Sequence, residues 1–338
     1  MPLRIAVLLI FLSAGFASAR DKDLEAYFID AEGGQATLIV TPSGQSVLID
    51  AGWADNNFRD ANRIAAAAKR AKVKKIDYFI LTHYHADHVG GVPQLAEKLK
   101  VGTYIDHGPN RETGSKRQQR MVDDYNKTIS GAQHIVAKAG DKLPIKGMDV
   151  TVVSADGNVI QNSLPGAGEQ NAWCAKTPDK QTDTSENARS LGTFWQMGKF
   201  RMADLGDLTW NKEKELVCPV NRLGKVDVFI VSHHGLDWSN SPALVDAVAP
   251  KVAIMGNGAK KGGSPDTYDT LKASPGIQAI WQLHFAEAGG KEHNTADAFI
   301  ANVNEADTGF YLKLTAHSDG SFEIYNPRNK MTKSYSVQ

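Results

Sequence analysis

Residues 76–91 read IDYFILTHYHADHVGG. The stretch opens as a mostly apolar run typical of a buried strand and closes with a Gly-Gly pair that favours a turn. Between the two lie four side chains that can bind a metal ion, all within six residues: His83, His85, Asp87 and His88. Imidazole nitrogens and carboxylate oxygens are the ligands that zinc and similar divalent ions take. The stretch therefore predicts a metal site directly after a strand.

The spacing of these side chains predicts two groups of ligands. Side chains alternate along a strand, so His83 and His85 are expected on the same face. The chain then turns, which lets Asp87 and His88 approach from another direction. Two ligand pairs with different directions suit two divalent ions that share an activated oxygen nucleophile. We expect zinc, with manganese as the alternative, and a solvated loop rich in His and Asp is the reading that this pattern disfavours.

Other strand-like runs also end in potential ligands. Asp50 closes the run VLID, Asp207 follows MADLG, and His233 and His234 follow VFIVS. Ligands collected at strand ends are a common way for α/β sheets to build a site. We expect Asp50 to orient an imidazole through a hydrogen bond, with a turn-forming aspartate as the alternative.

The order of these motifs resembles the metallo-β-lactamase superfamily. The segments that carry the resemblance are LIDAG at 48–52, THYHADH at 82–88, Gly206-Asp207 and a late histidine. FIDAEGGQA at 28–36 and SHHG at 232–235 are similar to the lactamase-like domain of the bacterial DNA-uptake competence channel and its soluble relatives. The match spans roughly residues 24 to 260. Its motifs are specific for the superfamily and not for a substrate.

The resemblance implies a role for each ligand. His83 and His85 would bind one metal ion, Asp87 and His88 would bind the other, and Asp207 would bridge the two.

The resemblance also implies that His233 or His234 completes the second metal site. Because an extended strand end aims only one of two neighbours inward, we take His234 as the ligand and His233 as a substrate or acid–base group, and the choice stays open. Many members carry a further histidine before the bridging aspartate, but residues 184–190 read TSENARS, so Asn187 is the candidate that faces the metals. Asp87 is expected to take part in proton transfer.

The chain also alternates strand-like and helix-like segments in two halves, which predicts a mixed α/β (α+β) fold, a four-layer αββα sandwich. Helices are expected near 58–71, 92–100, 115–129, 210–217, 241–248 and 265–273, and a hairpin near 309–325. Residues 20–338 would form a single domain, with an insertion near 155–188 overhanging the active site. Within it, Trp173 could stack on substrate or belong to a small satellite core.

The N-terminus predicts export. Arg4, an apolar run at 5–12 and Ala17-Ser18-Ala19 match a secretory signal peptide cleaved after Ala19, with a retained anchor as the alternative. The protein would then be periplasmic or secreted, with no membrane contact after cleavage. Such a compartment permits a disulfide between Cys174 and Cys218, whose pairing the sequence leaves open.

The formal net charge of zero argues against strong nucleic-acid binding, and the oligomeric state stays open. The expected reaction is hydrolysis of a phosphoester or phosphodiester by a metal-bound hydroxide, with a small-molecule or phosphoester substrate. Hydrolysis of a lactam, lactone or thioester is the alternative, and a non-catalytic binding protein is the third possibility. His107 and His284 each follow a strand, where they would line the cleft or form structural hydrogen bonds.

Overall fold

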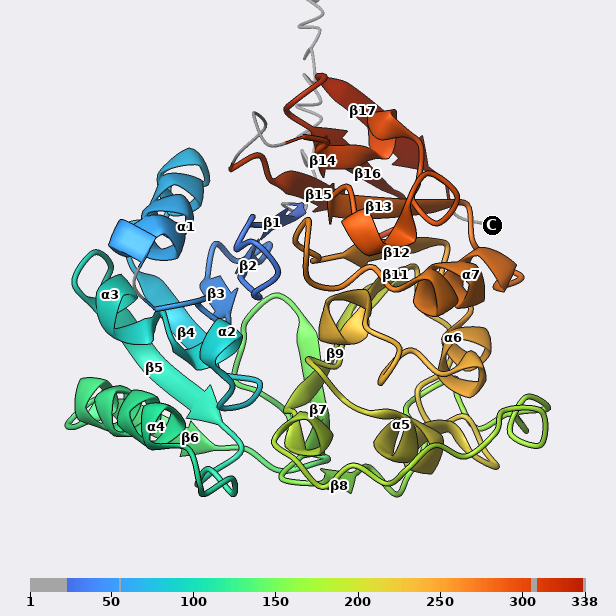
Figure 1. Ribbon diagram of the computed structural model, residues 1–338, viewed down its shortest axis with the longest axis horizontal. Helices are drawn as coiled ribbons and strands as arrows, with labels where there is room; N and C mark the ends of the chain where they lie inside the picture. The colour runs from blue at the N-terminus through green and yellow to red at the C-terminus, as the bar shows by residue number, and fades with distance from the viewer. Residues whose placement is uncertain (1–22, 55, 305–308, 337–338) are drawn as a thin grey trace, which may run out of the picture.

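The computed structural model describes residues 23–54, 56–304 and 309–336 (Figure 1). The predicted signal peptide, residues 1–19, lies outside the described residues and stays a prediction. Among the described residues, no helix has the length and apolar character needed to cross a membrane.

The first of two sheets has nine strands within these residues, in the order β17-β16-β15-β1-β2-β3-β4-β5-β6. Strand β3 pairs in parallel with β4, and β4, β5 and β6 continue in parallel, whereas the remaining neighbours are antiparallel. Its strands are β1 (Leu24–Phe28), β2 (Thr37–Val40), β3 (Ser46–Ile49), β4 (Ile76–Ile80), β5 (Val101–Asp106), β6 (Gln133–Val136), β15 (Leu312–Ala316), β16 (Phe322–Asn326) and β17 (Met331–Tyr335).

The second sheet has eight strands in the described part of the chain, in the order β14-β13-β12-β11-β10-β9-β7-β8. Strands β10 to β14 are parallel, and their carboxyl ends therefore lie at one edge of the sheet. Its strands are β7 (Asp149–Ala155), β8 (Asn158–Val159), β9 (Gly192–Met197), β10 (Phe200–Asp204), β11 (Val228–Ile230), β12 (Val252–Met255), β13 (Ala279–His284) and β14 (Ile300–Asn302).

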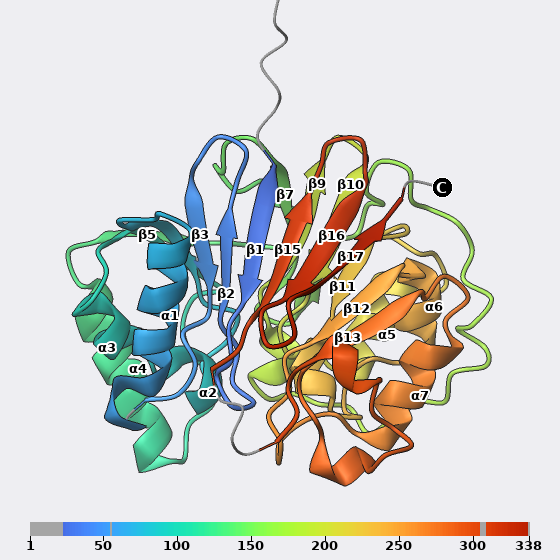
Figure 2. The same ribbon diagram turned by 90° about the horizontal axis from the view of Figure 1, so that it is seen from above.

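Helices cover the outer faces of both sheets, and the two inner faces pack against each other (Figure 2). The layer between the sheets is apolar, and Trp195 and Trp281 are its largest side chains. The first sheet is covered by α1 (Arg59–Arg70), α3 (Val92–Ala96) and α4 (Lys116–Ile129), and the second by α5 (Trp210–Val217), α6 (Pro242–Val248) and α7 (Pro265–Ala273). The predicted four-layer αββα sandwich is confirmed.

The segments between the longer elements contain short helical turns: η1 (Asn56–Phe58), α2 (Ala86–Val89), η2 (Asn187–Arg189), η3 (Ser232–Gly235), η4 (Glu287–Gly289) and η5 (Asp297–Phe299). One expectation about the length of an element was wrong. The helix expected over 92–100 ends at Ala96, because the Lys100 carbonyl accepts a hydrogen bond from Ile76 N and the chain must already be extended there. The predicted C-terminal hairpin is present as β15 and β16, and a further strand, β17, pairs with β16.

The segment expected as an overhanging insertion is anchored against α5. Cys174 and Cys218 form a disulfide with 5.7 Å between their α-carbons, and Gln170 forms a β-bridge with Val220. Trp173 is 38% exposed, and its ring lies 4.9 Å from the Lys176 ammonium. The part of the insertion that carries the disulfide thus packs beside α5, and the end of the insertion, which leads into η2, supplies the residues near the predicted site.

Candidate metal centre

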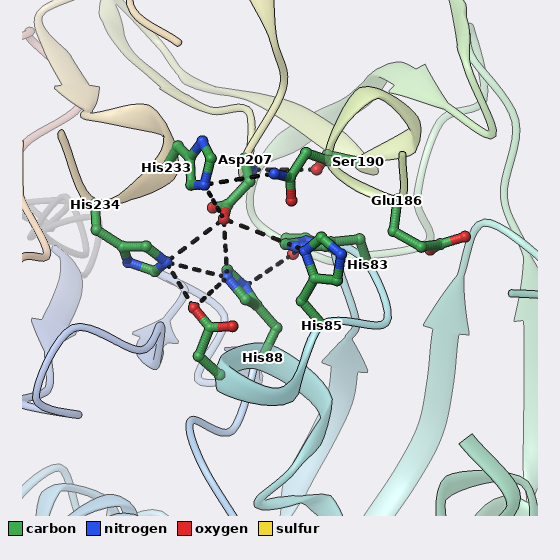
Figure 3. A network of polar contacts seen from close by, with 12 residues as sticks. His83, His85, His88, Glu186, Ser190, Asp207, His233 and His234 are labelled. Atoms are coloured by element: carbon green, nitrogen blue, oxygen red, sulfur yellow. Dashed lines mark hydrogen bonds and ion pairs between the residues drawn. The ribbon is translucent and has the colours of Figure 1, made fainter. Parts of the chain in front are cut away.

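The predicted ligands of the HYHADH segment converge because β4 leads into a single helical turn. His85 is still extended, with φ −71° and ψ 154°, and α2 begins at the next residue. The turn carries Asp87 and His88 back over the end of the strand, where His83 already lies. Figure 3 shows the imidazoles of His83 and His88 pointing toward Asp207, which follows β10 of the other sheet.

One group of four side chains is buried and compact. The ligand atoms of Asp87, His88, Asp207 and His234 all lie within 4.8 Å of one another. His234 Nε2 lies 3.0 Å from Asp87 Oδ2 and 3.2 Å from His88 Nε2. His88 Nε2 lies 3.3 Å from Asp207 Oδ2. Imidazole nitrogens that face each other and two carboxylates at this spacing form the donor set that a divalent cation takes.

A second group lies beside the first and shares Asp207 with it. His83 Nε2 is 3.1 Å from His85 Nδ1 and 3.8 Å from Asp207 Oδ2. His233 Nε2 is 3.6 Å from the same carboxylate oxygen. The Asp207 side chain therefore lies between two sets of nitrogens, as expected for the predicted bridging residue.

Asn187 lies next to the second group, where the sequence lacks the further histidine. Its Nδ2 is 3.4 Å from His233 Nε2, and within the described part of the chain its buried Oδ1 has no hydrogen-bond partner. Rotation of the amide exchanges its nitrogen and oxygen, so an oxygen ligand can face the group.

The argument that only one of the two neighbouring histidines could point inward was wrong. Strand β11 ends at Ile230, and both His233 and His234 have left-handed backbones, with φ values of 53° and 55°. This conformation is unfavourable for residues other than glycine and occurs where surrounding contacts enforce it. Here His233 N donates to Gly206 O at 3.1 Å, and His234 O accepts from Gly263 N at 3.0 Å. Both imidazoles thus face Asp207, at 3.6 and 3.5 Å.

The charges of the compact group fit a bound cation. Burial lowers the pKa of His88, but the carboxylates of Asp207, Asp87 and Asp50 outweigh burial and raise that pKa well above its ordinary value. Burial raises the pKa of Asp207 and Asp87, yet the neighbouring imidazoles hold both well below their usual range. The carboxylates therefore stay ionised and attract positive charge, which a divalent ion supplies better than a proton on His88.

Asp50 lies behind His88, as predicted. Its Oδ2 accepts hydrogen bonds from His88 Nδ1 at 2.7 Å and from Thr82 Oγ1 at 2.7 Å, and its Oδ1 accepts from Thr82 N at 2.8 Å. A proton on Nδ1 leaves the lone pair of His88 Nε2 free and aimed at the compact group.

Two glutamates that the sequence analysis missed support the second group. Glu112 Oε2 lies 3.2 Å from His85 Nε2, and Glu112 Oε1 accepts from Glu186 N at 2.8 Å. The buried Glu186 carboxylate is 3.0 Å from Nε2 of His107, which is therefore linked to His85 through Glu186 and Glu112. No motif marks Glu112, because it comes from the loop after β5.

His284 lies apart from the metal ligands. Its Nε2 is 2.8 Å from Asp30 Oδ1, and the residue lines a cavity together with Glu32 and Lys261. Lys261, which the sequence analysis also missed, contacts the carboxylate of Asp87.

Comparisons with known proteins match the part of the chain that carries the HYHADH segment. Residues 29–129 match the family model described as Metallo-beta-lactamase superfamily. ComE operon protein 3 of Bacillus subtilis is 24% identical over 263 residues, which cover 74% of this chain and 30% of that protein. Recombination protein 2 of Haemophilus influenzae is 23% identical over 254 residues, 75% of this chain and 26% of that protein.

A third relative is hydroxyacylglutathione hydrolase of Klebsiella pneumoniae, which is 30% identical over 118 residues, 35% of this chain and 37% of that enzyme. The chain thus spans well under half the length of each of these relatives.

Proposed function

We propose that this chain, which carries a metallo-beta-lactamase superfamily domain, is a metal-dependent hydrolase of phosphoesters or phosphodiesters. The observation that supports this most directly is the shared Asp207 carboxylate, which lies within 3.8 Å of imidazole nitrogens from both ligand groups. Divalent cations held there would polarise the scissile ester and lower the pKa of a water molecule. Zinc is the expected ion, with manganese as the alternative.

The chain's own residues would position these components. Asp50, through His88, and Glu112, through His85, fix which ring nitrogen of each imidazole faces the cations. His233 is the candidate for proton transfer to the leaving oxygen, because its side chain is 11% exposed whereas that of His234 is fully buried. Asp87 would be a ligand whose carboxylate can also accept a hydrogen bond from the attacking water.

Carbonyl hydrolysis is the second candidate function. It is favoured by the match to hydroxyacylglutathione hydrolase, a hydrolase by its name, over the part of the chain that shares the metal motif. A third candidate, a binding protein without catalysis, would keep the same ligands but turn over no ester.

Metal removal and a substrate panel separate these functions. We expect chelation to lower turnover of bis(4-nitrophenyl) phosphate by at least about 100-fold, and zinc or manganese to restore it. Atomic emission would measure metal content beside assays with nitrocefin, a lactone and a thioester. If only the carbonyl substrates are turned over, phosphoester hydrolysis is rejected. If the protein binds no divalent ion on reconstitution, the metal site is rejected.

We also propose that the protein is exported. Disulfides persist in oxidising compartments, so the Cys174–Cys218 bond supports a periplasmic or secreted location. N-terminal sequencing of the mature protein should begin at Arg20, and a chain isolated with Met1 in place would contradict cleavage.

A further inference from the structure

Lys261 places a positive charge at the edge of the compact ligand group. It lies in the loop between β12 and α7, and its ammonium contacts the Asp87 carboxylate. The same ammonium is 4.9 Å from the centre of the Trp53 ring. With 31% of its side chain exposed, Lys261 reaches both the candidate metal ligands and the solvent side of the site.

The backbone around Lys261 is fixed relative to the ligands. Gly258 N donates to Lys261 O at 2.8 Å, one link within the loop. A β-carbon at Gly262 would lie 2.1 Å from His234 O, and one at Gly33 would lie 2.9 Å from Lys261 Cβ. These approaches leave no room for side chains and tie the loop to the backbone of a metal ligand. The backbone of Lys261 is therefore held in place beside the candidate ligands by these contacts.

A cavity of about 590 Å³ adjoins this lysine. Volumes between about 300 and 1,000 Å³ are typical of small-molecule sites. Lys261 and His284 line it, together with Glu32. Arg63 lies 3.3 Å from Glu32 Oε1 and 3.0 Å from Asp30 Oδ2, so these two carboxylates have a cationic neighbour. Glu287 also lines the cavity, and Lys261 is the lining lysine that contacts the Asp87 carboxylate.

An ammonium in this position opposes metal binding, because it repels a divalent cation held by the neighbouring Asp87. An oxyanion placed between the ammonium and the cations would remove this repulsion and gain a charge-assisted hydrogen bond. We propose that Lys261 binds a negatively charged oxygen of the substrate, beside the scissile bond. This inference rests on the proposed function and narrows its substrates to phosphate esters that carry a negative charge.

The test compares Lys261→Met and Lys261→Arg with a matched control, Lys291→Met. Lys291 is exposed and is not among the residues that line the cavity, and its substitution makes the same change in net charge. For bis(4-nitrophenyl) phosphate we expect Lys261→Met to lower kcat/KM by about 30-fold, mainly through KM. Turnover of uncharged 4-nitrophenyl acetate should fall far less, metal content should be equal or higher, and Lys261→Arg should retain most activity.

Binding of inorganic phosphate to the zinc-loaded protein, measured by calorimetry, provides a readout without turnover. We expect the dissociation constant of phosphate to rise by a similar factor in Lys261→Met and to stay unchanged in Lys291→Met. Equal losses on the charged and uncharged esters, an equal effect of Lys291→Met, or lost metal would overturn the inference. Lys261-dependent phosphate binding in a protein that hydrolyses no phosphate ester would instead reject the proposed function alone.

Discussion

Asp207→Asn is expected to lower turnover by about 1,000-fold while part of the metal content is retained. The Asp207 Oδ2 atom lies 3.3 Å from His88 Nε2 and 3.8 Å from His83 Nε2, between the two ligand groups. Asparagine keeps the shape of the Asp207 side chain, and the backbone N at this position still donates to Ser190 Oγ at 3.1 Å. The substitution removes the negative charge that two cations could share. Elemental analysis combined with steady-state kinetics measures both effects.

Asp204→Asn is the matched control, because Asp204 is a buried aspartate at the end of the same strand. Burial raises the pKa of Asp204 to about 7, so that near neutral pH its carboxyl is already partly uncharged. Its Oδ1 accepts from Gly206 N at 3.0 Å, a bond that the amide oxygen can keep. We expect metal content and turnover within severalfold of the unchanged protein. Full activity of Asp207→Asn, in contrast, would contradict the role of Asp207 as the carboxylate that bridges the two ligand groups.

His88→Ala is expected to remove about one bound ion per chain and to lower turnover by several orders of magnitude. The fully buried ring contacts Asp50, His234 and Asp207 at 2.7, 3.2 and 3.3 Å. Its removal deletes one nitrogen ligand and leaves the Asp50 carboxylate buried without its imidazole partner. Metal titration and the melting temperature of the metal-loaded protein measure the two consequences.

Asp50→Asn provides a graded comparison with that variant. Both carboxylate oxygens of Asp50 accept hydrogen bonds, from His88 Nδ1, Thr82 Oγ1 and Thr82 N. The asparagine amide has only one oxygen that can accept. We expect metal affinity to fall by about 10- to 100-fold, since the ring of His88 loses its orienting partner. Asp77→Asn, in β4 of the same sheet, changes an aspartate that bonds Ser46 and should leave metal affinity unaltered. If His88→Ala kept its full metal content, the assignment of His88 as a metal ligand would be rejected.

The local parts of the fold followed from sequence patterns. Helix α4 lies at Lys116–Ile129, close to the predicted 115–129, because its apolar spacing and the Ser115 cap are both local signals. The position of β17 did not follow, since its strand is recognised by pairing with β16 and its residues alternate only weakly. The backbone of His233 and His234 was also beyond a pattern argument, because contacts with Gly206 and Gly263 impose it.

The sequence by itself determined the candidate ligands of the HYHADH segment, because alternation along a strand and one helical turn act over a few residues. Only the tertiary structure decided what faces them. His88 and His234 are 146 residues apart, and Asp87 and Lys261 are 174 residues apart. Such contacts depend on how two sheets pack across an apolar core, which no local pattern specifies. The candidate metal ligands can therefore be identified from the sequence, whereas the Lys261 ammonium beside them and the cavity that Lys261 lines result from the packing.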